Sequence, residues 1–344
     1  MKRRSSVSAN RQDRINNKSK KEKKRSLSWI LLPALIIGLS SAAYATFLYS
    51  KAESVMNSSY KPIDRGSKRV FKNVTVENTS ILFIGIDDSK KRKEGNSRSD
   101  ALMLATFNKK DKSIKLLSIP RDSYVQIPEK NIYTKITHAH EYGGVRLTLD
   151  TVEGLLDIPI NYYVEMNFNA FMDVINALGG IDVNVPYTFT EQDSQDHQGA
   201  ITLQKGMQHV NGEQALAFAR TRHYDSDIYR GKRQQEIMKA ILAKATSVKS
   251  VSNYSKVIEA VAKNMTTDLT FDQMLSFINY LKAGSGLNTE SLTLKGSDSY
   301  INGVYYYQLD QASLNETKLI LKNHLLGKTT SSRTPSTNES SSNN

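Results

Sequence analysis

Short apolar runs alternate with segments of helical period through the middle of the chain. Residues 81–86, ILFIGI, form a continuous apolar run that is typical of a strand covered on both faces. The runs ALMLATFN and SIKLLSIP flank the polar stretch KKDK, and this pattern predicts a β-hairpin. Further strands are expected at Tyr162–Met166 and Ile181–Val185, with shorter ones near Leu292 and Tyr305.

Segments of helical period fill most of the chain between and after these strands. The predicted helices are Arg146–Leu156, Asn169–Leu178, Gly212–Ala219, Arg230–Val248, Tyr254–Asn264, Phe271–Leu281 and Gln311–Leu325. Gly179 and Gly180 close the second of them, because glycine is favoured just after a helix C-terminus. The alternation of strands and helices predicts a single α/β domain with a sheet core and helical layers.

A different apolar pattern lies near the N-terminus. Residues 28–49, SWILLPALIIGLSSAAYATFLY, carry no charge and are long enough to cross a hydrocarbon core of about 30 Å. Trp29, Tyr44 and Tyr49 lie near the ends of this run, as in an aromatic belt. We interpret the run as an uncleaved transmembrane helix. A cleavable signal peptide is the alternative, because small residues within the run offer a cleavage site.

The formal net charge of +13 is concentrated ahead of this apolar run. Residues 1–27 hold 11 lysines and arginines against two acidic residues, whereas the rest of the chain holds 36 against 32. This asymmetry predicts a single-pass protein of the cell membrane with its N-terminus in the cytoplasm and everything after Tyr49 outside. That location argues against nucleic acid as a partner. The basic tail then acts as a topology determinant that is also available to anionic lipid.

These patterns divide the 344 residues into five parts. They are a basic cytoplasmic tail at 1–27, a transmembrane helix at 28–49, a polar extracellular stalk at 50–78, an extracellular α/β domain at 79–327 and a low-complexity tail at 328–344, which we expect to be disordered. The chain contains no cysteine, which excludes disulfides, thiolate metal sites and cysteine nucleophiles.

The predicted helix that starts at Arg230 carries polar residues on its apolar face. At 100° per residue, Ile237 and Ile241 share one face, and Arg230 and Gln234 fall in the middle of it. Burying an unpaired guanidinium costs on the order of several kcal/mol, so Arg230 needs an anionic partner. Asp227, three residues earlier, is one candidate and also suits a helix cap.

Further arginines occur at the ends of other predicted elements. Arg220 and Arg222 are two apart, so an extended backbone points both the same way, and Arg98 and Asp100 repeat this spacing. Arg121 follows the end of a predicted strand. Any one such pair is compatible with a surface salt bridge, which is worth about 0–1 kcal/mol. Arginines at four chain locations near element ends favour instead a shared anionic ligand, and several planar guanidinium groups suit a diphosphate.

Two aspartates suggest a metal site. Asp87 ends the first predicted strand, and Asp87 and Asp100 together with phosphate oxygens and water would suit Mg²⁺, which prefers few protein ligands. The alternative for Asp87 is a strand-terminal residue that caps a turn.

Other motifs carry less chemistry. His138 and His140 lack the further ligands of a zinc site, and we interpret them as structural or as positioning the substrate. The chain has neither a GxxxxGK[ST] phosphate loop nor a G-x-S-x-G motif, so a P-loop and a nucleophilic serine are unsupported.

Seven motifs between Ile81 and Lys244 resemble the LytR–CpsA–Psr family of bacterial envelope proteins, and within it the polyisoprenyl-teichoic acid–peptidoglycan teichoic acid transferases of Gram-positive bacteria. In order they are ILFIGID, RSDALMLATFN, LLSIPRDSYVQIP, KITHAHEYGGV, NALGGIDVNV, GEQALAFARTR and RGKRQQEIMKAI. The resemblance implies an α/β/α domain with a central mixed sheet.

The resemblance also implies a ligand, a polyprenyl pyrophosphate that carries a glycopolymer, with its lipid in a hydrophobic channel and its diphosphate at the arginines. The implied pyrophosphate contacts are Arg98, Arg121, Lys135, Arg220, Arg222, Arg230 and Gln234. Asp87 and Asp100 match the family's magnesium ligands. Asp227 matches a carboxylate that orients an arginine, and Asp225 is the other candidate for that role.

The implied activity is that of a phosphotransferase. It would move a teichoic acid or a similar anionic glycopolymer from the lipid carrier to a peptidoglycan hydroxyl, with Arg98, Asp100, Arg121, Arg220 and Arg222 as the expected catalytic residues. One alternative is a pyrophosphatase that acts on the same lipid with water as the acceptor. The other is a non-enzymatic membrane-anchored protein that binds or regulates envelope polymers, and the inward-facing Arg230 counts against it.

Overall fold

The computed structural model describes residues 46–64, 78–87, 97–222, 227–247, 264–283 and 287–328. The predicted cytoplasmic tail, most of the predicted transmembrane helix, nearly all of the predicted helix at 254–264 and the C-terminal tail after Lys328 lie outside these residues. Within the described ranges, no helix is both long and apolar enough to cross a membrane. The chain divides into two compact units, Met1–Ala52 and Glu53–Asn344, and every described strand belongs to the second.

A mixed six-stranded sheet, in the order β11–β6–β1–β2–β3–β12, forms the centre of the second unit. Strand β1 (Thr79–Ile86) lies parallel to β6 (Tyr162–Asn167) and antiparallel to β2 (Ser99–Asn108). β2 continues into β3 (Ser113–Ile119) as the predicted hairpin. The edges are β12 (Asn288–Thr293), parallel to β3, and β11 (Met265–Thr267), antiparallel to β6. The predicted strands of the sheet core are confirmed.

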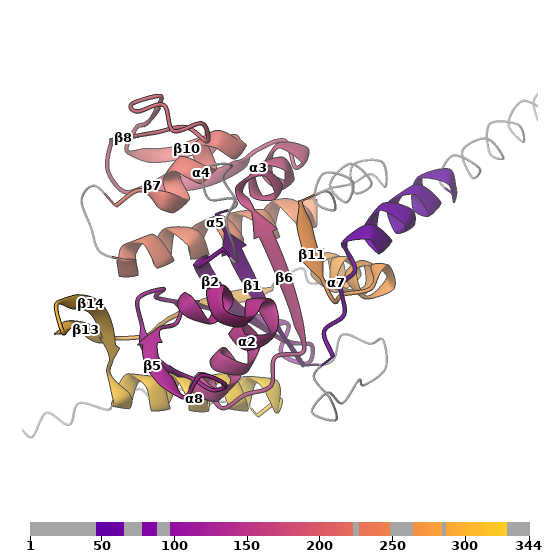
Figure 1. Cartoon of the computed structure of the whole chain (residues 1–344). Coiled ribbons are helices and arrows are strands. Elements are labelled where there is room, and N and C mark those ends of the chain that lie inside the picture. Colours follow the sequence, from indigo (N-terminus) through magenta and orange to yellow (C-terminus); the bar gives the residue numbers. More distant parts are fainter. Residues whose placement is uncertain are drawn as a thin grey trace, which may run out of the picture. The chain divides into compact units, whose positions relative to one another are not determined.

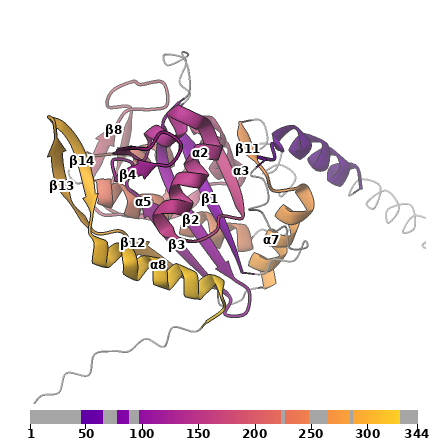
Figure 2. The same ribbon diagram turned by 60° about the horizontal axis from the view of Figure 1, so that its bottom comes forward.

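Helices cover both faces of this sheet. They are α2 (His138–Leu156), α3 (Phe168–Ala177), α4 (Gly212–Arg220), α5 (Asp227–Ser247), α7 (Phe271–Ala283) and α8 (Gln311–Leu325). Helices α2 and α8 pack on one face, and α5 crosses the other (Figures 1 and 2). A further helix spans residues 46–59, across the predicted boundary between transmembrane helix and stalk. The predicted α/β class with helical layers is confirmed.

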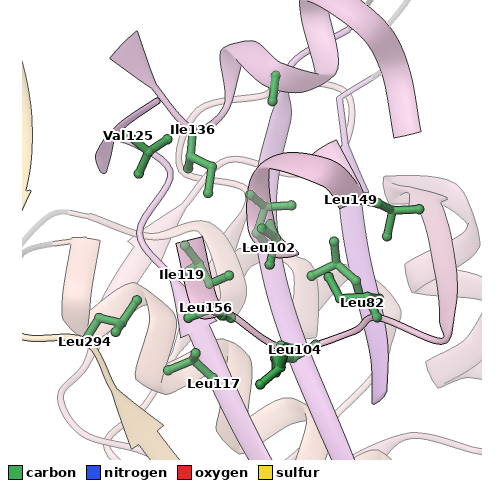
Figure 3. Close-up of a cluster of buried hydrophobic side chains, with 14 of the residues drawn as sticks. Leu82, Leu102, Leu104, Leu117, Ile119, Val125, Ile136, Leu149, Leu156 and Leu294 are labelled. Carbon is green, nitrogen blue, oxygen red and sulfur yellow. The ribbon is translucent and has the colours of Figure 1, made fainter. Parts of the chain in front are cut away.

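The main hydrophobic core lies between the sheet and helices α2 and α8. Alternate residues of β1 and β2, including Leu82, Leu102 and Leu104, point into it and are almost fully buried, together with Leu149 and Leu156 of α2 (Figure 3). Successive residues of a strand point to opposite faces, so the other residues of β1 and β2 face the side that α5 covers. One face of the sheet is therefore closed by a dry core, and the other is free to line a cavity.

Four two-stranded ribbons surround the sheet. They are β4 (Tyr124–Ile127) with β5 (Ile132–Lys135), β7 (Ile181–Val185) with β10 (Gly206–Val210), β8 (Phe189–Glu191) with β9 (Ile201–Leu203), and β13 (Gly296–Ile301) with β14 (Val304–Leu309). The sequence predicted β7 and the strand near Tyr305, which is β14. The remaining ribbon strands were not predicted.

Two helices start earlier than predicted. α2 begins at His138 rather than at Arg146, and Gly143 and Gly144 within it have non-helical backbone angles, with a φ of 61° at Gly144. Positive φ suits glycine, so this kink separates the first turn from the regular helix that the periodicity predicted. α5 begins at Asp227, which places this carboxylate in the first turn of the helix.

Candidate functional site

A cavity of about 620 Å³ is lined by the sheet face opposite the core and by helices α3, α4, α5 and α7. This volume lies within the range of about 300–1,000 Å³ that is typical of small-molecule sites. Most of the lining side chains are apolar. They include Phe83 of β1, Met103 of β2 and Val164 of β6, with Phe277 and Leu281 of α7 on the opposite wall. This part of the cavity suits an apolar ligand.

The lining changes from polar to apolar along α5. Arg230 and Gln234 line the cavity from the first turns of the helix, and Ile241 and Leu242 line it further along. At a rise of 1.5 Å per residue, Arg230 and Leu242 lie about 18 Å apart along the helix axis. Arg230 is only 7% exposed, so the prediction that Arg230 and Gln234 face inward together with Ile237 is confirmed.

Three other segments bring charged residues to the same end of the cavity, here called the polar end. Arg121 follows β3, Asp100 lies in β2, and Arg220 and Arg222 lie at and just after the end of α4. Four of the arginines that the sequence analysis grouped, counting Arg230, therefore line one cavity.

Arg121 and Asp100 form the ion pair nearest the sheet. Arg121 Nη1 donates to Asp100 Oδ1 at 2.6 Å, and Arg121 Nε lies 3.7 Å from Asp122 Oδ2. The sequence analysis did not single out Asp122, which is 8% exposed and also lies 2.8 Å from Lys135 Nζ. Lys135 therefore joins this network through Asp122 and is not among the cavity-lining residues. The position of Asp122 directly after Arg121 in PRD was the available signal.

Asp227 is the carboxylate between two arginines of the polar end. Its Oδ2 accepts from Arg230 Nη2 at 3.1 Å, and its Oδ1 lies 3.6 Å from Arg222 Nε. Burial raises the pKa of Asp227, the charge of Asp122 raises it further, and the charges of Arg222 and Arg121 only partly oppose this rise. Asp227 thus has the position expected of an arginine-orienting carboxylate. The other candidate, Asp225, lies outside the described residues.

Backbone carbonyls and an aromatic ring, rather than a carboxylate, hold Arg220. Its Nη2 donates to the carbonyl oxygens of Gln192 at 3.2 Å and Asp193 at 2.6 Å, and its guanidinium carbon lies 6.0 Å from the centre of the Phe168 ring. Within the described residues, Nε of Arg220 and Nε of Arg121 are buried without a hydrogen bond. Buried donors are normally satisfied, so these N–H groups are available to an anionic ligand.

Arg98 is the predicted site arginine that does not line the cavity. Its Nε donates to Glu141 Oε2 at 2.7 Å, and its side chain is 55% exposed. This hydrogen bond is the largest influence that raises the pKa of Arg98. Arg98 directly precedes β2, so it lies two residues from Asp100 of the polar end.

The two predicted metal ligands occupy neighbouring strand ends. Asp87 follows β1 and Asp100 lies at the start of β2, and the register pairs Ile86 with Ser99 across a bulge. Asp100 lines the cavity, whereas Asp87 is not among the lining residues. Among the residues that the structure describes, no group of three or more histidine or carboxylate side chains forms a metal cluster. Two carboxylates at adjoining strand ends nevertheless fit Mg²⁺ together with an anionic ligand, because this ion completes its shell with water and phosphate oxygens.

Arg233 hydrogen-bonds to the backbone of the segment that carries Arg220 and Arg222, a role that the sequence analysis missed. It is 5% exposed, and its Nε donates to the carbonyl oxygen of Phe218 at 3.1 Å. Its Nη2 donates to the carbonyl oxygen of Thr221, the residue between Arg220 and Arg222. Arg233 therefore fixes the backbone that presents both arginines. Arg230, Lys232 and Arg233 all lie within the first turns of α5. Their spacing in the sequence did not show that Arg233, unlike the other two, holds the backbone of the neighbouring segment.

Helix α5 is itself fixed closely to the sheet. Gln235 Nε2 donates to the carbonyl oxygens of Leu116 at 3.2 Å and Leu292 at 2.8 Å. A Cβ atom on Gly231 would lie 2.6 Å from Ser118 Oγ, so only glycine lets the helix approach β3 this closely. These contacts determine where Arg230 and Gln234 enter the cavity.

His140 has a structural position. Its Nδ1 hydrogen-bonds with the carbonyl oxygen of Ser97 at 2.6 Å, and its Nε2 with Glu165 Oε1 at 2.9 Å. This agrees with the interpretation of the THAHEYGG histidines as structural, and it ties α2 to the segment that carries Arg98.

Comparison with known proteins gives a consistent family assignment. The model of the LytR_cpsA_psr family matches residues 46–323. The chain is 38% identical over 319 residues to the polyisoprenyl-teichoic acid–peptidoglycan teichoic acid transferase TagT of Bacillus subtilis, which covers 89% of this chain and 97% of that protein.

Solved structures agree with this match. TagT bound to LI-WTA is similar with a TM-score of 0.66 and 40% identity, over 77% of this chain and 99% of that one. The family protein YwtF (TagT) with bound octaprenyl pyrophosphate lipid is similar with a TM-score of 0.62 and 39% identity, over 77% and 99% of the two chains. The chain therefore belongs to the LytR_cpsA_psr family.

Proposed function

We propose that the protein transfers a glycopolymer from a polyprenyl pyrophosphate carrier to a hydroxyl group of peptidoglycan. The observation that carries this proposal is a single cavity with an apolar interior and a polar end that holds Arg121, Arg220, Arg222 and Arg230. The apolar part suits an isoprenoid chain, and guanidinium groups suit the diphosphate. The transferase name and the bound octaprenyl pyrophosphate of the similar TagT proteins support the same conclusion.

In the proposed reaction, the acceptor hydroxyl attacks the phosphorus that carries the polymer. A new P–O bond forms to the acceptor, the bond from that phosphorus to the bridging oxygen breaks, and polyprenyl phosphate leaves with the bridging oxygen. Negative charge on the phosphate oxygens is stabilised by guanidinium groups that are already in position. Asp100 Oδ1 already accepts a hydrogen bond from Arg121, so we assign the hydroxyl proton to the leaving phosphate and no side chain to the role of general base.

The predicted site residues take different roles in this proposal. Arg121 and Arg220, each with a buried Nε that lacks a hydrogen bond, contact the reacting phosphate, and Arg222, Arg230 and Gln234 bind the rest of the diphosphate. Lys135 acts through Asp122. Arg98 acts at the outer rim beside Asp100, and Asp227 orients Arg222 and Arg230.

Asp87 and Asp100 are the proposed ligands of Mg²⁺. When bound, the ion neutralises charge on the diphosphate oxygens. Asp87 follows the end of β1, and Asp100 lies at the bulge near the start of the neighbouring β2, and this placement at adjoining strand ends supports the assignment.

We also propose that residues 28–49 anchor the protein in the cell membrane, with residues 1–27 in the cytoplasm and the catalytic domain outside. The uncharged apolar run and the excess of positive charge before it support this orientation.

The direct test is incubation of the full-length protein with a synthetic polyprenyl-pyrophosphate-linked glycan and peptidoglycan, with Mg²⁺ or with EDTA. We expect glycan that remains attached to peptidoglycan after detergent extraction, release of polyprenyl phosphate, and a much lower yield in EDTA. Free glycan without attachment would indicate a pyrophosphatase. Binding of the lipid without turnover would indicate a non-enzymatic polymer-binding protein.

Arg222 and Arg146 form a matched pair of arginines for the same assay. Their side chains are 43% and 42% exposed and both contact carboxylates, but only Arg222 lines the cavity. We expect Arg222→Ala to lower kcat/KM by about 100-fold, because removing one donor to a developing charge costs about 3 kcal/mol. Arg146→Ala should leave kcat/KM within about twofold, as expected for an exposed ion pair. Equal losses in the two variants would contradict the placement of the diphosphate.

A further inference from the structure

Five tyrosine rings on two neighbouring hairpins form two groups of ring contacts, with Lys135 between the groups, and we call this set the tyrosine row. In the β4–β5 hairpin, the ring centres of Tyr124 and Tyr133 lie 5.6 Å apart. Tyr124 also meets Tyr306 of β14 edge to face at 4.9 Å, and Tyr300 and Tyr305 pair across the β13–β14 hairpin at 5.6 Å. The two hairpins are far apart in the sequence and adjacent in the fold (Figures 1 and 2).

Lys135 connects the tyrosine row to the polar end of the cavity. Its Nζ lies 5.6 Å from the ring centre of Tyr305 and 5.9 Å from that of Tyr306. The same Nζ lies 2.8 Å from Asp122 Oδ1, and Asp122 follows the cavity-lining Arg121. Two side chains, those of Lys135 and Asp122, thus lie between the rings of Tyr305 and Tyr306 and the proposed diphosphate site.

Backbone contacts fix this arrangement. Tyr307 N donates to the carbonyl oxygen of Asp122 at 2.8 Å, and Ser123 and Tyr307 form a parallel β-bridge. The hydroxyl of Tyr305 donates to Asp298 Oδ1 at 2.9 Å. Burial, then Asp298 and the more distant charges of Asp122 and Asp227, raise the pKa of Tyr305, so its hydroxyl stays a donor. The hairpin therefore has a defined position relative to Arg121.

The exposure of the outer rings indicates more than a structural role. Ring pairs across strands stabilise two-stranded hairpins, and this accounts for the inner members of the row. Tyr300 and Tyr133 belong to such pairs as well, but they are 73% and 58% exposed at the two ends, so much of each side chain is open to a ligand. An exposed tyrosine offers an apolar ring face and a hydroxyl at its edge, a combination that suits the C–H face and the hydroxyl groups of a sugar ring.

The charges near the tyrosine row favour one kind of sugar chain. Lys135, which lies near two of the rings, is already paired with Asp122. Asp298 lies within the row, and the ring faces carry partial negative charge. Both disfavour a chain with a phosphate in every repeat, such as a teichoic acid. A chain of uncharged or amino sugars meets no such repulsion, and a row of rings suits an extended strand.

We infer that the tyrosine row binds consecutive sugar rings of the acceptor glycan and holds the acceptor hydroxyl at the polar end of the cavity. That this glycan is the acceptor of the reaction rests on the proposed function. The row then supplies the second substrate site of the transferase, outside the cavity that takes the lipid. It provides affinity and alignment for a strand that has no lipid of its own.

The test titrates the full-length protein in detergent with isolated peptidoglycan glycan strands, with poly(glycerol phosphate) and with polyprenyl pyrophosphate. The double variant Tyr133→Ala/Tyr300→Ala should raise the Kd for glycan strands about tenfold or more, since each lost ring contact weakens binding several-fold. Its Kd for polyprenyl pyrophosphate should stay within about twofold, because the two exposed rings lie outside the cavity. Tyr133→Phe/Tyr300→Phe keeps the rings and should retain most of the glycan affinity.

Met207→Ala is the control, because it removes a 69% exposed apolar side chain from β10 and should change none of the three Kd values. An unchanged Kd for glycan strands in the double alanine variant would overturn the inference. An effect of the tyrosines on poly(glycerol phosphate) alone would overturn it as well, because the row would then serve the donor polymer. If the unaltered protein fails to bind polyprenyl pyrophosphate, the proposed function falls, whereas tyrosine-dependent glycan binding would still establish the row as a glycan site.

Discussion

Carboxylates or backbone carbonyls hold the cations at the polar end. Arg121 is held by Asp100, Arg230 by Asp227, and Arg220 by backbone carbonyls. The guanidinium groups are therefore oriented before a ligand arrives, so little reorganisation is needed when charge develops. Across the network, the cations Arg121, Lys135, Arg220, Arg222 and Arg230 outnumber the carboxylates Asp100, Asp122 and Asp227. The excess positive charge favours an anion.

A single buried histidine should dominate the acid sensitivity of the fold. His324 of α8 is 4% exposed, with its Nδ1 2.8 Å from Thr106 Oγ1 and its Nε2 2.9 Å from Ser113 Oγ. Burial, assisted by the charge of Lys115, lowers the pKa of His324 from 6.5 to about 4. The unfolded chain takes up a proton near pH 6.5 and the folded chain does not, so the stabilisation is present above pH 6.5 and is lost as the pH falls toward 4.

The expected loss is about 3 kcal/mol, because each unit of pKa shift corresponds to about 1.4 kcal/mol. His324→Gln keeps polar atoms at the site but does not titrate. Urea unfolding at a series of pH values between 7 and 4 should therefore show a steeper fall for the unaltered protein than for the variant. If the free energy of unfolding fell equally with pH in the unaltered protein and in the variant, the folded state would not lower the pKa of His324.

At the scale of elements, α5 links the sheet to the polar end, and its closest approach is at Gly231. A Cβ there would lie 2.6 Å from Ser118 Oγ. Alanine favours an isolated helix by about 1 kcal/mol over glycine, but overpacking of this kind costs about 1–3 kcal/mol. We expect Gly231→Ala to lower the free energy of unfolding and to weaken polyprenyl pyrophosphate binding, because α5 must move with Arg230 and Gln234.

Gly154→Ala is the matched control for this prediction. Gly154 lies within α2, is exposed, and has no heavy atom within 4 Å of a Cβ added there. The same substitution should raise stability by about 0.5–1 kcal/mol at this position and leave lipid binding unchanged. Denaturant unfolding and lipid titration of both variants measure these effects. Stabilisation by Gly231→Ala would show that α5 is packed less tightly than the structure indicates.

The elements that the sequence predicted share a strong local signal. The apolar run of β1 and the period of α3, α7 and α8 identified these elements almost to the residue. Ribbons such as β8–β9 have strands of three residues, too short for any periodicity to register. The kink at Gly143 and Gly144 likewise divided α2, so that only the part after it was predicted.

The site was predicted by residue type, and the one contact that was expected, Arg230 with Asp227, joins residues three apart in the sequence. The helical projection placed Arg230 and Gln234 inward because that inference needs only the helix period. The other partners are tertiary, so the pairing of Asp122 with Lys135 and the hydrogen bond from Arg233 to the carbonyl of Thr221 had no local signal. The tyrosine row was missed for the same reason, since Tyr124 and Tyr306 meet only after two separate hairpins have folded.

At the scale of the whole molecule, the cavity has a direction that constrains the substrate. The arginines lie at the N-terminal end of α5, and the apolar lining extends toward Leu242 and α7. For the proposed reaction, we therefore expect the lipid carrier to enter with its diphosphate at the polar end, beside the tyrosine row. Under the proposed function, donor phosphate and acceptor sugar meet at one edge of the domain, while the lipid remains on the far side of the arginines.

The proposed membrane anchor should matter only when the substrate is also in a membrane. Deleting residues 1–45 leaves the sheet, its covering helices and the whole region that matches the family intact, so the domain is expected to fold. Tethering an enzyme beside a membrane-embedded substrate raises the effective concentration, and avidity gains of this kind reach about 100-fold or more. We therefore expect the truncated protein to react about 100-fold more slowly than the full chain with lipid-linked substrate in vesicles, and at a similar rate with a water-soluble, short-chain prenyl analogue. Circular dichroism serves as the folding control. Equal rates on vesicles would mean that these residues contribute nothing to substrate capture, whereas equal losses on both substrates would trace the defect to the domain and not to the membrane.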